Sequence, residues 1–218
     1  MTPHSYSALS AFQDCPRRYH ETKILRRWPE PESQAMIDGK ELHEAFAAAL
    51  KTDGALPAAH SVHGPLLKKI QSQDGTLLVE QKWAITSDFD PIPWNSEDAW
   101  LRAVADAVIL QPPIGFAYDW KTGKRQNQKS DLQLVLIALV MFAHFPDLRV
   151  IGTSYIWLNE GVETQRIVKR ANIGNEWLKI LPQIKMLEHA HLDEHFPAKP
   201  NRFCKRYCSV RSCEYWGK

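Results

Sequence analysis

The stretch VADAVILQPPIGFAYDWKTGK, residues 104–124, constrains the fold of this chain more than any other segment. Two short apolar runs flank a turn-like Gln-Pro-Pro-Ile-Gly, which predicts two antiparallel strands joined in a hairpin. Each run carries one aspartate, Asp106 or Asp119, among residues of the kind that form a core. Because a lone carboxylate is costly to bury, the pattern indicates that these two side chains have partners.

The length of the turn decides whether the two carboxylates meet. With the four-residue turn 111–114, Leu110 pairs with Gly115, and Asp106 lies directly opposite Asp119, about 5 Å away on the same face. A five-residue turn instead sends the two side chains to opposite faces. Adjacent carboxylates repel each other unless a cation neutralises them, so a metal site at this position predicts the four-residue turn.

A hard cation with oxygen ligands, Mg²⁺ or Mn²⁺, suits this pair of carboxylates. Lys121 follows Asp119 by two residues and therefore lies on the same face of the strand, where its ammonium group can act on a phosphate or on an attacking water. The alternative is an exposed Asp119–Lys121 ion pair on a surface hairpin, which is the commoner outcome for an isolated Asp-x-Lys pattern.

The rest of the chain predicts an α/β fold with a central mixed β-sheet flanked by helices. The expected helices are a short one capped at Ser5 or Ser7 that stops near Cys15-Pro16, a second helical piece after it, and helices over 38–51, 131–145 and about 175–191, the last bent or broken at Pro182. The expected strands are 76–85, 100–110, 114–120, 149–158 and 162–170. Residues 53–65, rich in Gly, Pro and His, predict a loop.

Composition, with 44% hydrophobic and 24% charged residues, indicates a globular protein. The length of 218 residues suits one α/β domain with a real core, or one domain plus a small appendage, and we expect a single domain over 1–218. The net charge of +2 does not by itself indicate a nucleic-acid partner. The longest apolar stretch, 132–145, is shorter than the roughly 20 residues that cross a bilayer, and no apolar signal region is visible at the N-terminus. We therefore expect a soluble cytoplasmic protein of a bacterium or a phage-infected host cell, with no membrane partner.

The segment from Asp106 to Asp119-Trp120-Lys121 resembles the PD-(D/E)xK nuclease signature, and YDWKTGK resembles its form in RecB-like nucleases. Three more elements follow the order of that family. GKELH at 39–43 is similar to its Gly-x-x-x-His helix, AVAD at 103–106 to its Gly-x-x-Asp strand, and QLVLIA at 133–138 to its Gln-x-x-x-Tyr helix. Ala103 stands where glycine is usual, and Ile137 replaces the tyrosine.

The resemblance implies a restriction-endonuclease-like core over about 36–195. It also implies that Mg²⁺ or Mn²⁺ is bound by His43, Asp106, Asp119 and the backbone carbonyl of Trp120, and that Lys121 and Gln133 are catalytic. Two alternatives stay open from the residues themselves. His43 shares a helical face with apolar side chains and can be a core histidine, and Gln133, near a helix end, can simply meet solvent.

Four cysteines form a second pattern: Cys15 near the N-terminus, and Cys204, Cys208 and Cys213 within ten residues of a basic, aromatic tail. They predict a metal site formed by segments 5–27 and 196–218, and tetrahedral zinc suits such a set. The same arrangement is similar to that of AddB-type and CRISPR-associated RecB-like nucleases, which implies a [4Fe-4S] cluster, with zinc as the alternative. The final spacing, C-x3-C-x4-C, departs from the usual C-x2-C-x5-C of those proteins.

Together these inferences predict a metal-dependent DNA exonuclease, bacterial or phage-encoded, that hydrolyses phosphodiester bonds at linear or single-stranded ends during recombination, repair or replication. One alternative keeps the enzyme but makes it a CRISPR-adaptation-type nuclease that trims DNA ends. Another is a non-catalytic DNA-binding module that keeps the fold. A third is a zinc-dependent regulatory protein whose tail is the functional part.

Overall fold

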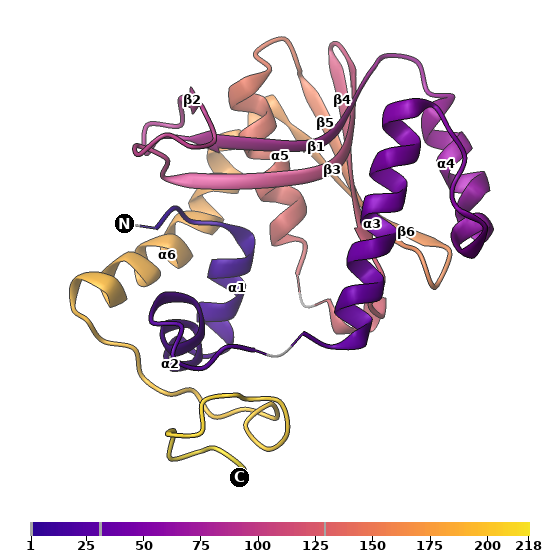
Figure 1. Cartoon of the computed structure of the whole chain (residues 1–218). Coiled ribbons are helices and arrows are strands. Elements are labelled where there is room, and N and C mark those ends of the chain that lie inside the picture. Colours follow the sequence, from indigo (N-terminus) through magenta and orange to yellow (C-terminus); the bar gives the residue numbers. More distant parts are fainter. Residues whose placement is uncertain (1, 31, 129) are drawn as a thin grey trace. The chain divides into compact units, whose positions relative to one another are not determined.

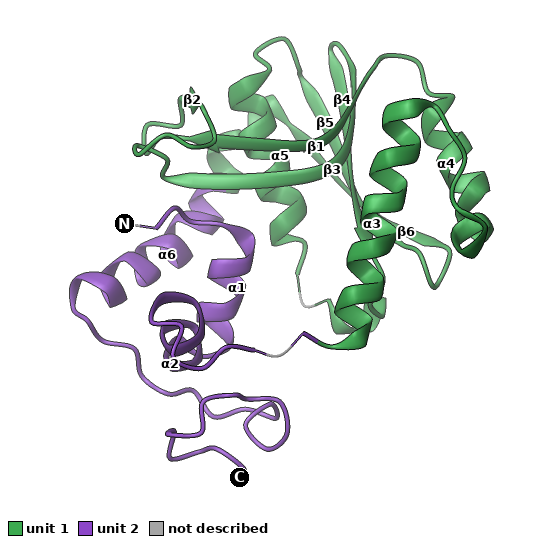
Figure 2. Ribbon diagram, in the orientation of Figure 1, with its two compact units in different colours: residues 1, 33–176 green, residues 2–32, 177–218 purple. Residues whose placement is uncertain are grey.

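The computed structural model describes residues 2–30, 32–128 and 130–218. Two compact units make up the chain (Figure 2). We call residues 33–176 the sheet unit, and residues 2–32 with 177–218 the terminal unit. The single domain over 1–218, with a core over about 36–195, stays a prediction, whereas both segments expected to carry the cysteine site, 5–27 and 196–218, belong to the terminal unit.

A six-stranded mixed sheet forms the centre of the sheet unit, in the order β2-β1-β3-β4-β5-β6 (Figure 1). Its strands are β1 (Thr76–Ile85), β2 (Pro91–Ile92), β3 (Leu101–Gln111), β4 (Ile114–Lys121), β5 (Val150–Trp157) and β6 (Val162–Lys169). Neighbours are antiparallel except β4 and β5, which are parallel. The predicted α/β fold with a mixed sheet is therefore confirmed. The strand β2 was not expected, because two residues cannot show an alternating pattern.

Helices cover both faces of this sheet, with α3 and α4 on one face and α5 on the other (Figure 1). They are α3 (Gln34–Thr52), α4 (Gly64–Gln71) and α5 (Leu132–His144), with short 3₁₀ helices η2 (Ala58–His63), η3 (Arg125–Asn127) and η4 (Arg170–Asn172). The loop expected over 53–65 is wrong in part, since η2 and the start of α4 lie there. Pro65 is at the first turn of α4, where its missing N–H removes no helical hydrogen bond.

The core of the sheet unit is built from α3, α4 and the strands beneath them. Phe46 of α3 packs on Trp120 of β4, with 5.0 Å between the ring centroids, and both side chains are fully buried. On the opposite face α5 is buried along nearly its whole length, as its apolar sequence predicts. None of the described helices is both long enough and apolar enough to cross a membrane.

Helices from both ends of the sequence form the terminal unit: α1 (Tyr6–Asp14), α2 (Pro16–Tyr19), the π-helix η1 (His20–Ile24) and most of α6 (Ile173–Leu192). The hydroxyl of Ser5 accepts the N–H of Ala8 and so caps α1, as expected. Of the bend or break expected at Pro182, the break is wrong. The helix α6 continues through this residue, and buried Ile180 and Ile184 on either side hold the helix in place.

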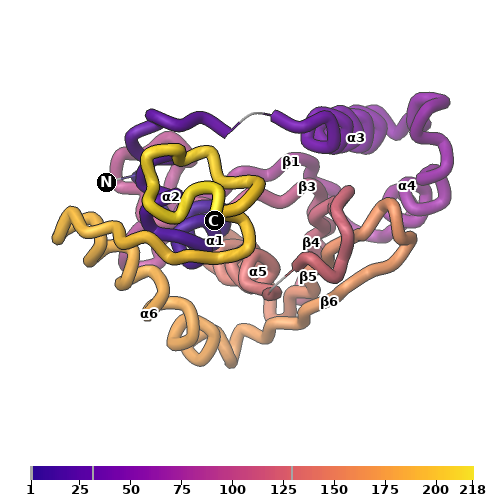
Figure 3. The backbone as a smooth tube through the Cα atoms, turned by 90° about the horizontal axis from the view of Figure 1, so that it is seen from below, coloured from indigo at the N-terminus to yellow at the C-terminus, as the bar shows by residue number. Residues whose placement is uncertain are grey.

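The last twenty residues have no regular helix or strand and lie beside α1 and α2 (Figure 3). Polar contacts fix them there. The side chain of Asn201 donates to the carbonyl of Asp14 over 3.0 Å, and Arg17 donates to Glu214 over 2.6 Å. The two ends of the chain are therefore part of one unit.

Candidate active site

Asp106 and Asp119 lie at the point where β3 and β4 separate. The ladder between these strands pairs Leu110 with Gly115, which confirms the predicted register, and it ends one residue before the two aspartates. Beyond the ladder, the backbone N–H of Trp120 donates to Oδ2 of Asp106 over 2.7 Å. The backbone N–H of Trp120 therefore donates to a side-chain oxygen of Asp106 and not to a backbone carbonyl of β3.

A local distortion on β1 frees Asp106 from its other neighbour as well. The pairing of β1 with β3 skips Glu80 and Asp106, and Glu80 has a φ of +52°, which is uncommon for a residue other than glycine. The carboxylate of Glu80 pairs with Lys51 of α3. The Glu80 carboxylate therefore forms its ion pair outside the site. On β3, Asp106 is the acidic residue.

Asp119 is buried, with only 6% of its surface exposed, but it has polar neighbours. The amide Nε2 of Gln133 donates to Oδ1 over 2.6 Å. Lys121 Nζ lies 2.7 Å from Oδ2 and forms an ion pair with it. Burial raises the pKa of Asp119 to about 6; Lys121 opposes the rise and Asp106 adds to it.

Gln133, in the first turn of α5, connects the lysine to this aspartate. While its amide nitrogen donates to Asp119, its carbonyl oxygen accepts a hydrogen bond from Lys121 Nζ over 2.9 Å. The ammonium group also lies 5.0 Å from the centre of the Tyr155 ring, a cation–π contact. Lys121 is therefore held at a fixed place beside the carboxylates, while its side chain remains partly open to solvent.

His43 reaches the site from α3, where its Nδ1 lies 3.4 Å from Oδ1 of Asp106. Burial lowers the pKa of this imidazole, but the neighbouring Asp106 and Asp119 carboxylates outweigh burial and raise the pKa overall. Gly39, one turn earlier on α3, makes the approach possible, because a Cβ there would lie 2.9 Å from Oγ1 of Thr122. The absence of a side chain at Gly39 allows α3 to lie against the end of β4.

The chemistry of these donors fits a hard divalent cation. The site offers two carboxylates and an imidazole, and carboxylate oxygens are ligands that Mg²⁺ and Mn²⁺ prefer. Across 2–30, 32–128 and 130–218, no three His, Cys, Asp or Glu side chains are already arranged around a point where an ion would sit. Those side chains are neighbours, and their role as ligands, like that of the Trp120 carbonyl, stays a prediction.

Comparison with known proteins identifies the family. A family model described as the PD-(D/E)XK nuclease superfamily matches residues 3–213. The chain belongs to the PD-(D/E)XK nuclease superfamily. Membership implies a nucleic-acid substrate, hydrolysis of phosphodiester bonds and use of a divalent metal.

A solved structure shares the fold of this PD-(D/E)XK chain at low sequence identity. A "Putative exonuclease" from Eubacterium rectale has a TM-score of 0.52 and 14% identity over 96% of this chain and 88% of that one. The protein SSO0001 has a TM-score of 0.49 and 12% identity, over 99% and 87% respectively. Among curated protein sequences none matches significantly. At such identities the likeness concerns the fold alone.

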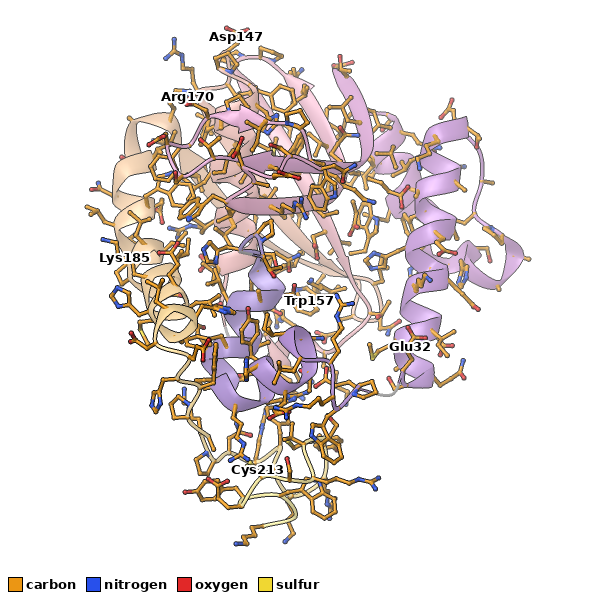
Figure 4. The ribbon with its side chains drawn as sticks, turned by 60° about the vertical axis from the view of Figure 1, so that its left-hand side comes forward. Glu32, Asp147, Trp157, Arg170, Lys185 and Cys213 are labelled. Atoms are coloured by element: carbon orange, nitrogen blue, oxygen red, sulfur yellow. The ribbon has the colours of Figure 1, made fainter. Side chains whose placement is uncertain are left out.

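The four cysteines of this PD-(D/E)XK protein line one small pocket in the terminal unit. Cys213 is labelled in the C-terminal segment in Figure 4. All four are free thiols, and two of the sulfurs accept backbone N–H groups, Cys15 from Lys199 and Cys204 from Asn201, each over 3.4 Å. Within the described residues they are not arranged around a single ion. An iron–sulfur site therefore stays a prediction.

One part of the site region was not expected from the sequence. A pocket of about 960 Å³ in the sheet unit is lined by His43 and Lys121 and also by His60 and His63 of η2. The two additional histidines lie in the segment expected as a loop. Their spacing of three residues, the period of a 3₁₀ helix, is the signal that could have placed them on one face.

Proposed function

We propose that this PD-(D/E)XK protein is a metal-dependent deoxyribonuclease, an exonuclease that acts on DNA ends in recombination, repair or replication. The observation that carries the proposal is the chain of contacts from Lys121 through Gln133 to the buried Asp119, next to Asp106 and His43. A lysine held beside two carboxylates suits phosphodiester hydrolysis. Burial of such a charged group is costly, so packing alone does not explain its position.

In the proposed site, His43, Asp106, Asp119 and the carbonyl of Trp120 would hold Mg²⁺ or Mn²⁺. A bound cation of this kind neutralises phosphate charge and lowers the pKa of a coordinated water. Lys121 supplies a positive charge toward the non-bridging phosphate oxygens, where charge accumulates as the water attacks.

Gln133 acts through the lysine. Its amide oxygen holds the ammonium group, and its amide nitrogen orients the Asp119 carboxylate. Because both ends of the amide are engaged, we assign Gln133 as a positioning residue. The family resemblance is compatible with two roles for Gln133, a contact with the scissile phosphate or a contact with Lys121. We propose the second role.

Two features support DNA ends as the substrate. The similar structure from Eubacterium rectale carries the name "Putative exonuclease", and an exonuclease cleaves from an end. In the terminal unit, Lys205, Arg206 and Arg211 are exposed, and such side chains bind phosphate backbones with a strong dependence on salt.

For the four cysteines we propose a [4Fe-4S] cluster, with zinc as the alternative. Their shared pocket and the N–H groups directed at two of the sulfurs support metal-bound thiolates. A cluster is larger than one ion and needs thiolates spaced further apart. Protein purified without oxygen should be brown and absorb near about 400 nm, whereas zinc, being d¹⁰, gives a colourless protein.

The decisive experiment for the nuclease is degradation of end-labelled linear DNA in Mn²⁺. Wild-type protein should degrade the DNA, and Asp119→Ala and Lys121→Ala should each abolish the activity. Glu80→Gln is the matched control, because its carboxylate faces Lys51 and not the site. Activity that survives both site substitutions would refute the assignment.

Binding of DNA without cleavage is the second candidate function. The observation that favours it is Ile137, a fully buried side chain at the position where related nucleases carry a tyrosine. The same assay separates the two functions: salt-dependent DNA binding by wild-type protein without any Mn²⁺-dependent degradation would support the second one.

A further inference from the structure

The pocket of about 960 Å³ extends from the proposed reaction centre across the sheet unit. At one end it is lined by His43 and Lys121, and further along by His60 and His63 of η2. Met36 and Lys40 of α3 and Asn159 also contribute to its walls. The pocket therefore adjoins two of the residues of the proposed reaction centre.

His60 and His63 lie on one face of η2. A 3₁₀ helix has three residues per turn, so side chains three apart stand above one another, and both imidazoles line the same pocket. The ring of His63 lies 6.0 Å from the ring of Phe46, which itself packs on Trp120. The buried core thus fixes the position of His63, and little freedom is lost when a ligand binds there.

The pocket is lined by both charged and uncharged polar side chains. Lys40 and Lys121 supply positive charge, and Asp38, the only acid among its described lining residues, accepts a hydrogen bond from Gln34 over 2.7 Å. Burial, and after it the neighbouring His60, lower the pKa of His63, so this imidazole is neutral at pH 7. A neutral imidazole offers an aromatic face, one donor and one acceptor. These groups suit a base or sugar better than a phosphate.

We propose that His60 and His63 bind the nucleotide next to the scissile phosphate, by stacking on its base and by hydrogen bonding, and that the pocket accepts an unpaired strand. The proposal rests on the proposed nuclease function and names its substrate class. Pockets of about 300–1,000 Å³ enclose ligands about the size of a nucleotide or two. Stacking on an imidazole needs an exposed base face, which an unpaired nucleotide offers and a base pair inside a duplex does not.

The test separates binding from cleavage. Binding of a fluorescent five-nucleotide single strand and of a blunt DNA hairpin is measured by anisotropy, in Ca²⁺, with protein carrying Asp119→Asn so that the DNA stays intact. Adding His60→Ala and His63→Ala together should weaken single-strand binding about tenfold or more, since stacking on aromatic side chains contributes this much per base. Hairpin binding should change less than about twofold.

Kinetics supply a second measurement on otherwise wild-type protein in Mn²⁺. The paired His60 and His63 substitutions should raise KM for the single strand about tenfold while kcat stays within about twofold, as expected when binding to ground and transition states is lost equally. His195→Ala is the matched control, because that exposed histidine lies in the terminal unit. Glutamine variants at 60 and 63, checked by circular dichroism, replace the alanine variants if those unfold.

The outcomes distinguish this proposal from the nuclease itself. Unchanged single-strand binding, or an equal loss for single strand and hairpin, would overturn the role of His60 and His63 even if wild-type protein degrades DNA. Selective loss of single-strand binding, with no cleavage by wild-type protein under any condition, would support the pocket and overturn the nuclease.

Discussion

The side-chain amide of Gln133 donates a 2.6 Å hydrogen bond to the carboxylate of Asp119, a group that is almost wholly buried. The first turn of α5 is thereby joined to the last part of β4, two segments that flank the basic loop in between. The same amide accepts a hydrogen bond from Lys121, so one side chain sets the position of both charged groups.

Removal of this amide should affect turnover more than binding. In Gln133→Ala, Lys121 loses an acceptor and Asp119 loses a donor, so we expect kcat to fall about 10- to 100-fold, since small displacements of catalytic groups have effects of this size. KM for linear DNA should change little. Gln165→Ala, on the exposed strand β6, serves as control. A rise in KM with unchanged kcat would instead place Gln133 in contact with the substrate.

The second prediction concerns stability and pH. The pKa of Asp119 is raised from 3.8 to about 6 in the folded protein, chiefly by burial, so the folded state holds this proton more tightly than the unfolded state. The stabilisation from the proton is complete below about pH 4 and is lost as pH rises through about 6. Asp119→Asn, which has no charge to bury, should therefore exceed wild-type protein in free energy of unfolding at pH 7.5.

The expected gain at pH 7.5, in metal-free buffer, is up to about 3 kcal/mol, and it should shrink toward zero at pH 4. Urea unfolding of both proteins across this pH range measures the difference. A gain that does not depend on pH would show that the Asp119 carboxylate is not the source. The variant is also expected to be inactive, so here stability and activity move in opposite directions.

The raised pKa further predicts how a cation competes with protons. A divalent ion needs the Asp119 carboxylate ionised, so Mn²⁺ should bind more weakly as pH falls through about 6. Titration calorimetry at pH 5.5 and 7.5 should show about fourfold tighter binding at the higher pH, because a carboxyl group with a pKa of about 6 is about one-quarter ionised at the lower pH, together with proton release below about pH 6. In Asp119→Asn both the affinity and its pH dependence should be lost.

The hairpin shows how far the sequence predicts this site. Strand periodicity predicts which residues of each strand share a face, but it left the turn length open. Only the expectation that the two carboxylates meet at a cation selected the four-residue turn. The contact of Gln133 with the hairpin depends on where α5 packs on the sheet, which no local pattern specifies. The release of Asp106 from β1 depends on the backbone of Glu80, whose left-handed φ is unusual for that residue type.

The segment around η2 shows where sequence analysis failed. Its Gly, Pro and His residues predicted a loop, since propensity for helix is low there. The structure forms short helices instead, because Leu67 and Ile70 of α4 are buried against the core and impose order on the residues before them. The pocket lined by His60 and His63 could not be predicted without that packing.

The last prediction concerns Gly39, which allows α3 to approach the end of β4. In Gly39→Ala the new Cβ would lie 2.9 Å from Oγ1 of Thr122, closer than side chains tolerate. The helix must move away or Thr122 must shift, so we expect a loss of about 1–3 kcal/mol in free energy of unfolding, the usual range for overpacking. Because His43 is one turn further along α3, activity should fall as well.

A double-mutant cycle tests this cause. Thr122→Ala removes the oxygen that would clash, so in that background Gly39→Ala should no longer destabilise the protein. Alanine is about 0.5–1 kcal/mol more favourable than glycine inside a helix, and Gly39 lies within α3, so the double variant should be more stable than Thr122→Ala alone. Urea unfolding of the four proteins measures the coupling. If Gly39→Ala is equally harmful with and without the Thr122 hydroxyl, the close approach of α3 to β4 is not what requires the glycine.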